Sequence, residues 1–392
     1  MQSITDSYFV PILNHSEFEK LVKNGEVNLE VENEHSLTLF LYVASIEKLS
    51  PQLEILLKYS YDTVFSQKKG GMHNALALAI FANNYKGAQL LLRYGFHPDM
   101  GSRKGTGISA PPLFLACKMK SVKMVKLLLD YNADVNQIHH HYTCLIHAAE
   151  NSELLIAKTL LEYGANPYHM HALYGSALNC AVWEDNFEMV QLLIEYGARA
   201  DVTNTENQSI LLAPAKNGNK VLILYLLQHG AAINGHCTNG ITPLMYICRY
   251  GTTYPKEICS MIQFMKSLGV NIHQKDKQGH TALWEAVESQ NILAVDCLRR
   301  LGGSLKEATY NHPRLFSSAN SEFLDYLLIN GADINIRSKD EEGNWVYDIL
   351  YYNQEPAAGI FEVIMSHMDK MEPALKEEFL TQRLSMLLAS SE

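Results

Sequence analysis

The sequence predicts an all-α solenoid of about ten helix-turn-helix units, joined by short β-hairpin turns and closed by helical caps. In one segment, Leu160–Tyr168 (LLEYGANPY), a leucine-rich helix ends at a glycine that is followed by Ala-Asn. Related segments recur at steps of 37, 32, 33, 33, 39, 33 and 29 residues, so the period is centred on about 33. The glycine position holds Gly95, Asn132, Gly164, Gly197, Gly230, Gly269, Gly302 and Gly331.

A second recurring segment opens the units. It occurs as Thr143–Ala149 (TCLIHAA), Gly175–Ala181 (GSALNCA), Gly240–Leu244 (GITPL) and Gly279–Leu283 (GHTAL). Together, in this order and phase, the two segments resemble the ankyrin repeat, which opens with G-x-T-P-L-H-x-A. The resemblance covers at least Asn74–Asn335. It implies an ankyrin-repeat solenoid that binds a partner protein and is not an enzyme.

Composition agrees with a long folded array. The chain has 392 residues, too many for one ordinary core, with 47% hydrophobic and 19% charged residues. A net charge of −10 argues against nucleic-acid or anionic-membrane binding, which needs a basic face. We expect no signal peptide and no membrane insertion, because no apolar run is long enough. Seven cysteines without a C-x-x-C pair indicate reduced thiols and a cytoplasmic protein.

The N-terminal part is expected to be a cap followed by a divergent repeat. Residues 1–35 form the predicted cap, in which Phe18–Asn28 resembles the second half of a repeat. The repeat array is predicted over residues 36–339. Its first unit has helices near Leu37–Ile46 and Pro51–Tyr59, and the proline fits the first turn of the second of these.

Three irregularities are expected farther along. Met100–Ala110 is predicted to be an inserted loop, and Gly251–Lys256 (GTTYPK) lies between the two helices of its repeat. The repeat that ends at Gly331 is short, with a first helix that starts near Pro313. Residues 340–392 are predicted to form a C-terminal helical cap with amphipathic helices at Gly359–Met368 and Pro373–Leu388.

Small and leucine residues recur where neighbouring units should meet. Ala116, Ala148 and Ala149 would let first helices approach closely, and leucine pairs would fill the space between second helices, each buried leucine contributing about 1.5–3 kcal/mol. The pairs are Leu127–Leu128, Leu160–Leu161, Leu192–Leu193 and Leu226–Leu227. The recurring glycines fit a helix end that needs positive φ, and Asn132 tolerates that conformation next best.

Two groups of residues could carry chemistry. The run His139-His140-His141 invites a metal site, but it falls at a hairpin tip and three adjacent residues rarely converge on one ion. His147 and Cys180 occupy one position in consecutive repeats, and stacking could pair them as base and nucleophile. That position normally faces inward, so we favour core packing. We therefore expect no catalytic residue, metal or cofactor.

Asn136 and Asn335 end their segments at the start of a hairpin. The resemblance implies that an asparagine here bridges the turn. It also implies a possible target of asparaginyl hydroxylases, and the sequence leaves open whether either residue is modified.

The resemblance places partner contacts at hairpin tips and at the exposed edge of first helices. Tyr142, Trp183, Arg249 and Tyr250 should lie on one concave strip, and these residue types are enriched in binding hot spots. For Trp183 the alternative is burial between repeats. The full predicted set is His139, His140, Tyr142, Trp183, Glu184, Glu206, Lys216, Arg249, Tyr250, Lys277 and His280.

The predicted function is therefore a scaffold that binds a partner protein on the concave face, as a monomer. Two alternatives stay open: an enzyme with a degenerate Cys–His site, and a structural spacer with an inert face. The array also resembles effectors that intracellular bacteria inject into host cells, in which case the protein would act in host cytoplasm. Eukaryotic cytosolic adaptors look much the same.

Overall fold

The computed structural model divides the chain into two compact units, Met1–Arg199 and Ala200–Glu392, which are described separately. The described residues are 15–27, 29, 38–60, 75–99, 110–172, 175–201, 203, 209–251, 255–309, 321–335, 358–377 and 379–381. Over these ranges the regular structure is helical, and the bridges with both partners described are His139–Tyr142 and His171–Gly175. Within the same ranges, every helix is too short or too polar to cross a lipid bilayer.

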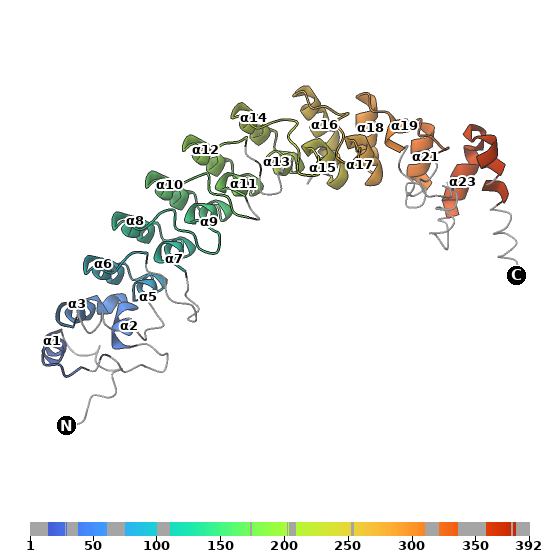
Figure 1. Ribbon diagram of the computed structural model, residues 1–392. Helices are drawn as coiled ribbons and strands as arrows, with labels where there is room; N and C mark the ends of the chain where they lie inside the picture. Colours follow the sequence, from blue (N-terminus) through green and yellow to red (C-terminus); the bar gives the residue numbers. More distant parts are fainter. Residues whose placement is uncertain are drawn as a thin grey trace, which may run out of the picture. The chain divides into compact units, whose positions relative to one another are not determined.

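Unit 1 arranges its helices in two rows (Figure 1). One row holds the first helix of each repeat, and the other holds the second helix, which packs against it. The first helices are α2 (Leu39–Ala44), α5 (Ala75–Phe81), α7 (Pro112–Lys118), α9 (Cys144–Glu150) and α11 (Ala177–Trp183). The second helices are α1 (His15–Lys23), α3 (Ser50–Tyr59), α6 (Tyr85–Arg93), α8 (Val122–Asp130), α10 (Leu154–Glu162) and α12 (Phe187–Glu195), with the 3-10 turn η2 (Glu47–Leu49) ahead of α3.

Unit 2 continues the same alternation within its own bounds. Its first helices include α13 (Leu212–Asn217), α15 (Pro243–Tyr250) and α17 (Ala282–Glu288), and the short helix α19 (Leu305–Thr309) packs on α17. Its second helices are α14 (Lys220–Gln228), α16 (Ile258–Ser267), α18 (Ile292–Arg300) and α21 (Ser321–Ile329). The 3-10 turn η4 (Pro255–Glu257) precedes α16, and α23 (Ala358–Ser366) and η5 (Met368–Lys370) follow.

The threonine of the opening segment begins the first helices. The side chains of Thr143, Thr242 and Thr281 accept the backbone N–H three residues later, which satisfies a donor that the helix start leaves unpaired. Second helices use asparagine in the same way. The capping residues are Asn84, Asn186, Asn219 and Asn291.

Most described repeats have two backbone positions of positive φ, whereas the unit formed by α2 and α3 lacks the one that follows the first helix. The one after the second helix is the predicted glycine position, and its prediction is confirmed: φ runs from 63° at Asn132 to 104° at Gly302. The other ends the first helix, and most of its residues are not glycine. It holds Asn83, Lys120, Ser152, Asp185, Gly218, Gly251 and Gln290, with φ between 54° and 73°.

The predicted stacking contacts are buried. Ala116, Ala148 and Ala149 are at most 1% exposed, and each leucine pair is buried except Leu227, which is half-buried. Asparagine side chains then tie one hairpin to the next. Asn136 accepts the backbone N–H of Asn166 at 2.7 Å and donates to the carbonyl of Gly164 at 3.3 Å. Asn335 likewise accepts the N–H of Glu372 at 2.8 Å, so the predicted bridging role holds at both asparagines.

The ends of the array agree with the predicted elements where they are described. α1, α2 and α3 fall on the three N-terminal helices that the sequence predicts, and α1 packs on α3. α23 falls within the first predicted C-terminal helix, and residues 373–377 and 379–381 are helical in the second. The inserted loop at 101–109 and residues 310–320, where a short first helix was expected, lie outside the described residues. The boundaries 1–35, 36–339 and 340–392 stay predictions.

Candidate functional site

In seven first helices one residue lies two positions before a turn of positive φ: it is the last residue of α5, α7, α9, α11 and α17 and the next-to-last residue of α13 and α15. We call this position the helix-end slot. It is held by Phe81, Lys118, Glu150, Trp183, Lys216, Arg249 and Glu288. Because the left-handed turn fixes the helix end, the slot presents a different side chain at the same place in each repeat. The side chains of Phe81 and Trp183 are 54% and 59% exposed.

Trp183 is the most exposed aromatic residue of the predicted set in unit 1. Its exposure means that Trp183 is not buried between repeats, the alternative that the sequence had left open. Glu184, which follows it, is also exposed and ends α11 through its backbone N–H to the carbonyl of Cys180. An exposed indole next to a carboxylate is a surface that suits an apolar and cationic ligand.

The histidine run forms a two-residue hairpin. His139 and Tyr142 exchange backbone hydrogen bonds of 2.8 and 3.0 Å, and His140 and His141 between them have φ of 49° and 70°. The ring of His139 lies 5.0 Å from that of Phe114, whereas the Tyr142 ring lies 4.3 Å from that of His171. The hairpin rings thus pack against aromatic neighbours. Over the described residues, the structure brings no metal-binding group together at this run.

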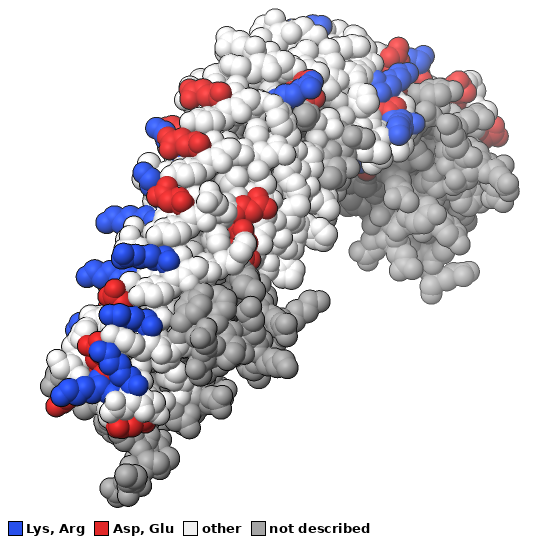
Figure 2. Space-filling model, turned by 60° about the vertical axis from the view of Figure 1, so that its left-hand side comes forward, with Lys and Arg blue, Asp and Glu red and all other residues white. Residues whose placement is uncertain are grey.

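Charge is unevenly distributed along unit 1. Residues 75–143 hold eight Lys and Arg against three Asp and Glu, whereas residues 144–199 hold two against seven. Figure 2 shows basic side chains gathered along one side of the unit, with acidic side chains following farther along it. Lys120 from the basic stretch meets Glu153 from the acidic stretch at 2.5 Å. A partner therefore faces two fields of opposite sign.

In unit 2, Arg249 is folded inward. Its Nε lies 2.9 Å from Oε2 of Glu285, whose side chain is 1% exposed. The next residue, Tyr250, is 61% exposed, and its ring lies 4.7 Å from that of Tyr246. Burial raises the pKa of Glu285 to about 7, while Arg249 opposes the shift. Arg249 is thus engaged within the protein, and Tyr250 is the residue of this pair that is presented outward.

The predicted hairpin residues Lys277 and His280 also make internal contacts. The backbone N–H of Lys277 donates to the carbonyl of Asn239 at 3.0 Å, and that of His280 donates to Oδ1 of Asp276 at 2.7 Å. The His280 ring stacks on Trp284 with centroids 3.5 Å apart and planes within 3°. The side chain of Lys277 itself remains exposed.

Asp276, His280 and Glu285 bring possible metal ligands within 4.8 Å of one another. The sequence did not predict this group, because its members belong to a hairpin and to the middle of a helix. Arg249 already provides a positive charge 2.9 Å from the Glu285 carboxylate. A divalent cation would have to lie beside that guanidinium, so we interpret the cluster as an ion-pair network.

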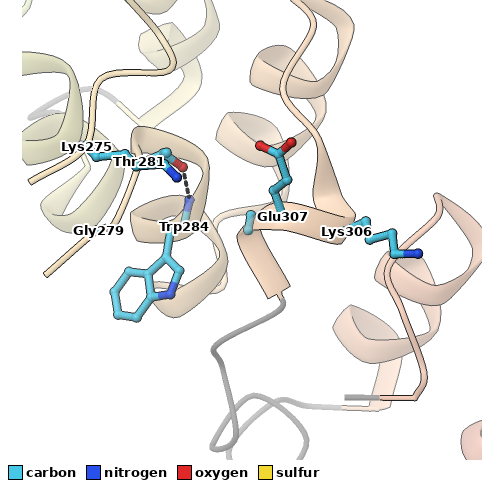
Figure 3. Close-up of a pocket in the computed structure, with 7 residues that line it drawn as sticks. Lys275, Gly279, Thr281, Trp284, Lys306 and Glu307 are labelled. Carbon is cyan, nitrogen blue, oxygen red and sulfur yellow. Dashed lines mark hydrogen bonds between the residues drawn. The ribbon is translucent and has the colours of Figure 1, made fainter. Parts of the chain in front are cut away.

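Next to this network, a pocket of about 350 Å³ opens between the α17 hairpin and α19 (Figure 3). Trp284 contributes its indole, and the backbone N–H of the same residue donates to Oγ1 of Thr281 at 3.2 Å. The remaining lining residues are Lys275, Gly279, Lys306, Glu307 and Ala308. A pocket with an aromatic wall suits an apolar group, and its lining charge is mixed, because Glu307 lines it together with Lys275 and Lys306, and the Lys306 ammonium lies 3.8 Å from Oδ2 of Asp333.

The proposed base and nucleophile are not activated. Burial, together with the charges of Glu150 and Glu184, raises the pKa of Cys180 to about 12, so the thiol stays protonated at neutral pH. Burial and Lys118 lower the pKa of His147, so the imidazole is neutral. A thiolate–imidazolium pair needs the opposite shifts.

Lys216 and Glu206 are the last two residues of the predicted partner-binding set. Lys216 lies in the last turn of α13 and is half-buried. Glu206 lies outside the described residues.

Comparisons with known proteins agree with the repeat architecture. Residues 97–171 and 178–262 match the family model described as ankyrin repeats in three copies. Ankyrin repeat protein FPV022 of fowlpox virus is 26% identical over 245 residues, which is 62% of this chain and 38% of the viral protein. Two further fowlpox ankyrin repeat proteins, FPV014 and FPV031, are matched over 28% and 50% of their lengths, so the chain spans half or less of each of these relatives.

Two solved structures are similar to parts of the chain. One is a chain from the complex of the Bd0816 predatory endopeptidase of Bdellovibrio bacteriovorus with immunity protein Bd3460, with 30% identity, a TM-score of 0.43, and 48% and 96% of the two chains covered. The other is the ankyrin repeat domain of Bcl-3, with 22% identity, a TM-score of 0.46, and 57% and 97% covered. Ankyrin repeats commonly mediate protein–protein interaction and are generally not enzymes. With its recurring hairpin and helix pair and its matched family model, this chain belongs to the ankyrin-repeat family.

Proposed function

We propose that this protein is a non-catalytic scaffold whose partner protein docks on the helix-end slots and the hairpins. The observation that carries the proposal is the 59% exposure of Trp183. A large aromatic side chain left in water has no stabilising role in the free fold. When a partner covers it, it becomes a hot spot of the kind at which tryptophan is enriched.

The charges of unit 1 define the partner further. Lys118 and Lys123 are exposed in the basic stretch, and Glu184, which follows Trp183, and Glu188 of α12 are exposed in the acidic stretch. We expect the partner to place acidic residues against the first group and basic residues against the second. Such exposed pairs act mainly on association rate and register, so binding should weaken as salt rises.

In unit 2 the proposed contacts are Tyr250, the exposed side chain of Lys277 and the Trp284 pocket. His139, His140 and Tyr142 would contribute the hairpin of unit 1. Arg249 and His280 support these contacts through their inward interactions rather than as anchors of their own. Glu206 and Lys216 stay in the proposed set on sequence grounds.

The test compares three baits in one affinity purification with mass spectrometry: the wild type, Trp183→Ala and Leu155→Ala. Leu155 is the matched control, because it is 67% exposed but lies on the second helix α10. A partner should be retained by the wild type and by Leu155→Ala and lost with Trp183→Ala. With that partner purified, truncation of Trp183 should cost about 2 kcal/mol, a loss in affinity of roughly thirty-fold.

The melting temperature of Trp183→Ala should stay near that of the wild type, because an exposed side chain contributes little to folding. A lower melting temperature with unchanged affinity would place Trp183 in the fold and remove the centre of the proposed surface. Equal losses for Trp183→Ala and Leu155→Ala would show that any exposed apolar group suffices.

Two rival functions have their own tests. Labelling of Cys180 by a thiol probe in the folded protein would support the enzyme alternative, whereas the raised pKa of Cys180 favours no reaction. Absence of any partner across several lysates would support the inert spacer. Action as an effector in host cytoplasm stays a prediction, which a translocation reporter fused to the chain would test. Sedimentation velocity would test the expectation of a monomer.

A further inference from the structure

Two cysteines from consecutive repeats of unit 2 lie side by side. Cys259 is in α16 and Cys297 is in α18, and these two second helices pack together. The thiol of Cys259 donates to the carbonyl of Leu293 at 3.3 Å, and the thiol of Cys297 donates to the carbonyl of Cys259 at 3.7 Å. Each thiol therefore contacts the backbone of the other cysteine's helix, so the two cysteines lie at one helix–helix contact, as disulfide formation requires.

The two thiols differ in exposure. Cys297 is 5% exposed, whereas Cys259 is half-buried and reachable from solvent. Unit 1 holds a second pair, Cys117 in α7 and Cys144 in α9, two helices that pack together, and the neighbouring Cys144 raises the pKa of the Cys117 thiol. Both of those residues are 1% exposed, so no reagent can reach either sulfur in the folded protein. Both pairs join neighbouring repeats, but only the unit 2 pair has an accessible member.

We propose that Cys259 and Cys297 form an oxidisable dithiol, which exchanges with a low-molecular-weight disulfide such as oxidised glutathione and closes a disulfide between α16 and α18. The Cys259 thiolate attacks one sulfur of oxidised glutathione and releases one glutathione thiolate. The sulfur of Cys297, after losing its proton to solvent, then attacks the Cys259 sulfur and expels the second glutathione. Two protein thiols are oxidised, and one glutathione disulfide is reduced to two glutathione molecules.

The second step should be the slow one. Burial, together with the neighbouring Cys259, raises the pKa of Cys297 to about 11. Only a small fraction of Cys297 is therefore thiolate at neutral pH. As long as the pH stays below the pKa, that fraction increases about tenfold for each unit by which the pH is raised. Ring closure should accelerate in the same proportion between pH 7 and pH 9.

The consequence for the protein is a covalent tie between two successive repeats. The two cysteines are separated by 38 positions. A bond between them closes this segment and restricts the unfolded chain, and it prevents α16 and α18 from separating during local opening. The amide hydrogens of α16 and α18 should therefore exchange more slowly in the oxidised protein.

The experiment treats the folded, full chain with oxidised glutathione at pH 8, blocks remaining thiols with an alkylating reagent, and maps all seven cysteines by peptide mass spectrometry. We expect a Cys259–Cys297 disulfide, a glutathione adduct on the half-exposed Cys237, and unmodified Cys117 and Cys144. Cys297→Ser should leave glutathione on Cys259, and Cys259→Ser should leave Cys297 unmodified.

Three results would overturn the proposal. A wild type in which Cys259 keeps its glutathione would show that Cys297 cannot resolve it. Unreacted Cys259 beside a fully modified Cys237 would show that Cys259 is not accessible. A Cys117–Cys144 disulfide formed to the same extent would show that oxidation follows unfolding rather than the exposure of Cys259.

Discussion

The carboxyl group of Glu285 should weaken the fold at neutral pH, and Glu285→Gln should therefore stabilise it. Glu285 is 1% exposed in α17 and lies 2.9 Å from the guanidinium of Arg249, which comes from the preceding repeat. Burial raises the pKa of Glu285 to about 7, and Asp276 and Glu288 add to the rise while Arg249 opposes it. The cost of burying the charge thus exceeds what the ion pair returns.

The direction and the size of the pH effect on stability follow from the pKa values of Glu285 in the native and the unfolded chain. Below pH 4.5, the ordinary value, the carboxyl group is protonated in both native and unfolded chains and contributes no pH dependence. Between pH 4.5 and about 7 the unfolded chain releases the proton and the native chain keeps it, so stability falls as pH rises. Each pH unit of this window is worth 1.36 kcal/mol, and the full loss is about 3 kcal/mol above pH 7.

Arg249→Leu should act in the opposite direction. It removes the positive charge and leaves a buried carboxylate without its partner, which costs about 3–5 kcal/mol when the group is ionised. Below pH 4.5 the carboxyl group is neutral, and the same substitution should cost much less. Opposite effects of two substitutions at one ion pair are a sharper test than the sign of either one.

The assay is urea unfolding followed by the fluorescence of Trp284, the neighbour of Glu285. Trp183→Phe and Trp345→Phe in the background leave Trp284 as the only tryptophan. The free energy of unfolding of this background should fall between pH 4.5 and pH 8, and that of Glu285→Gln should be flatter and higher at pH 8. A Glu285→Gln variant that is less stable at pH 8 would refute the reasoning, because pairing with Arg249 would then outweigh burial.

Two further predictions concern the repeat framework. Gly240→Ala should destabilise the protein more than Gly279→Ala, although both glycines have φ near 85°. A Cβ added at Gly240 would lie 3.0 Å from the backbone of Asp276 and Lys277, whereas no described atom lies within 4 Å of a Cβ added at Gly279. Chemical denaturation would compare the two variants. Asn136→Ala should cost about 1–2 kcal/mol, because its amide bridges two hairpins. Asn151→Ala, whose side chain bonds only its own helix, is the control.

The framework was predictable because it repeats. The glycine position recurs at a fixed period, and Asn132 fits it because asparagine tolerates a left-handed backbone. The second left-handed position escaped prediction, since residues such as Lys120 and Asp185 carry no compositional signal for positive φ. Aligning the repeats at the asparagine caps of second helices would have revealed its constant spacing.

The pairings between repeats were not predictable in the same way. Arg249 and Glu285 occupy different positions of their repeats, so no motif joins them. Cys259 and Cys297 are separated by 38 positions, so aligning the chain at a period of about 33 does not pair them. The position of Trp183 in its repeat suggests an exposed side chain, but the exposed fraction depends on how neighbouring side chains pack around it.

The helix-end slots also show what determines whether a side chain is available to a partner. The Lys118 charge lowers the pKa of His147 in the next repeat, and the Glu150 charge raises that of Cys180 in the repeat after it. Each helix-end residue thus lies near one inward residue of its successor. His147 and Cys180 are neutral, so they hold no charge to draw Lys118 or Glu150 inward.

Arg249 lies near Glu285 in the same relation, and there an ion pair forms at 2.9 Å. The inward residue Glu285 thereby determines whether the charge of Arg249, in the repeat before it, is available to a partner. A substitution at an inward position can consequently change binding without touching the surface. This coupling is why Arg249, which has the residue type of an anchor, is a poorer candidate than the exposed Trp183 and Tyr250.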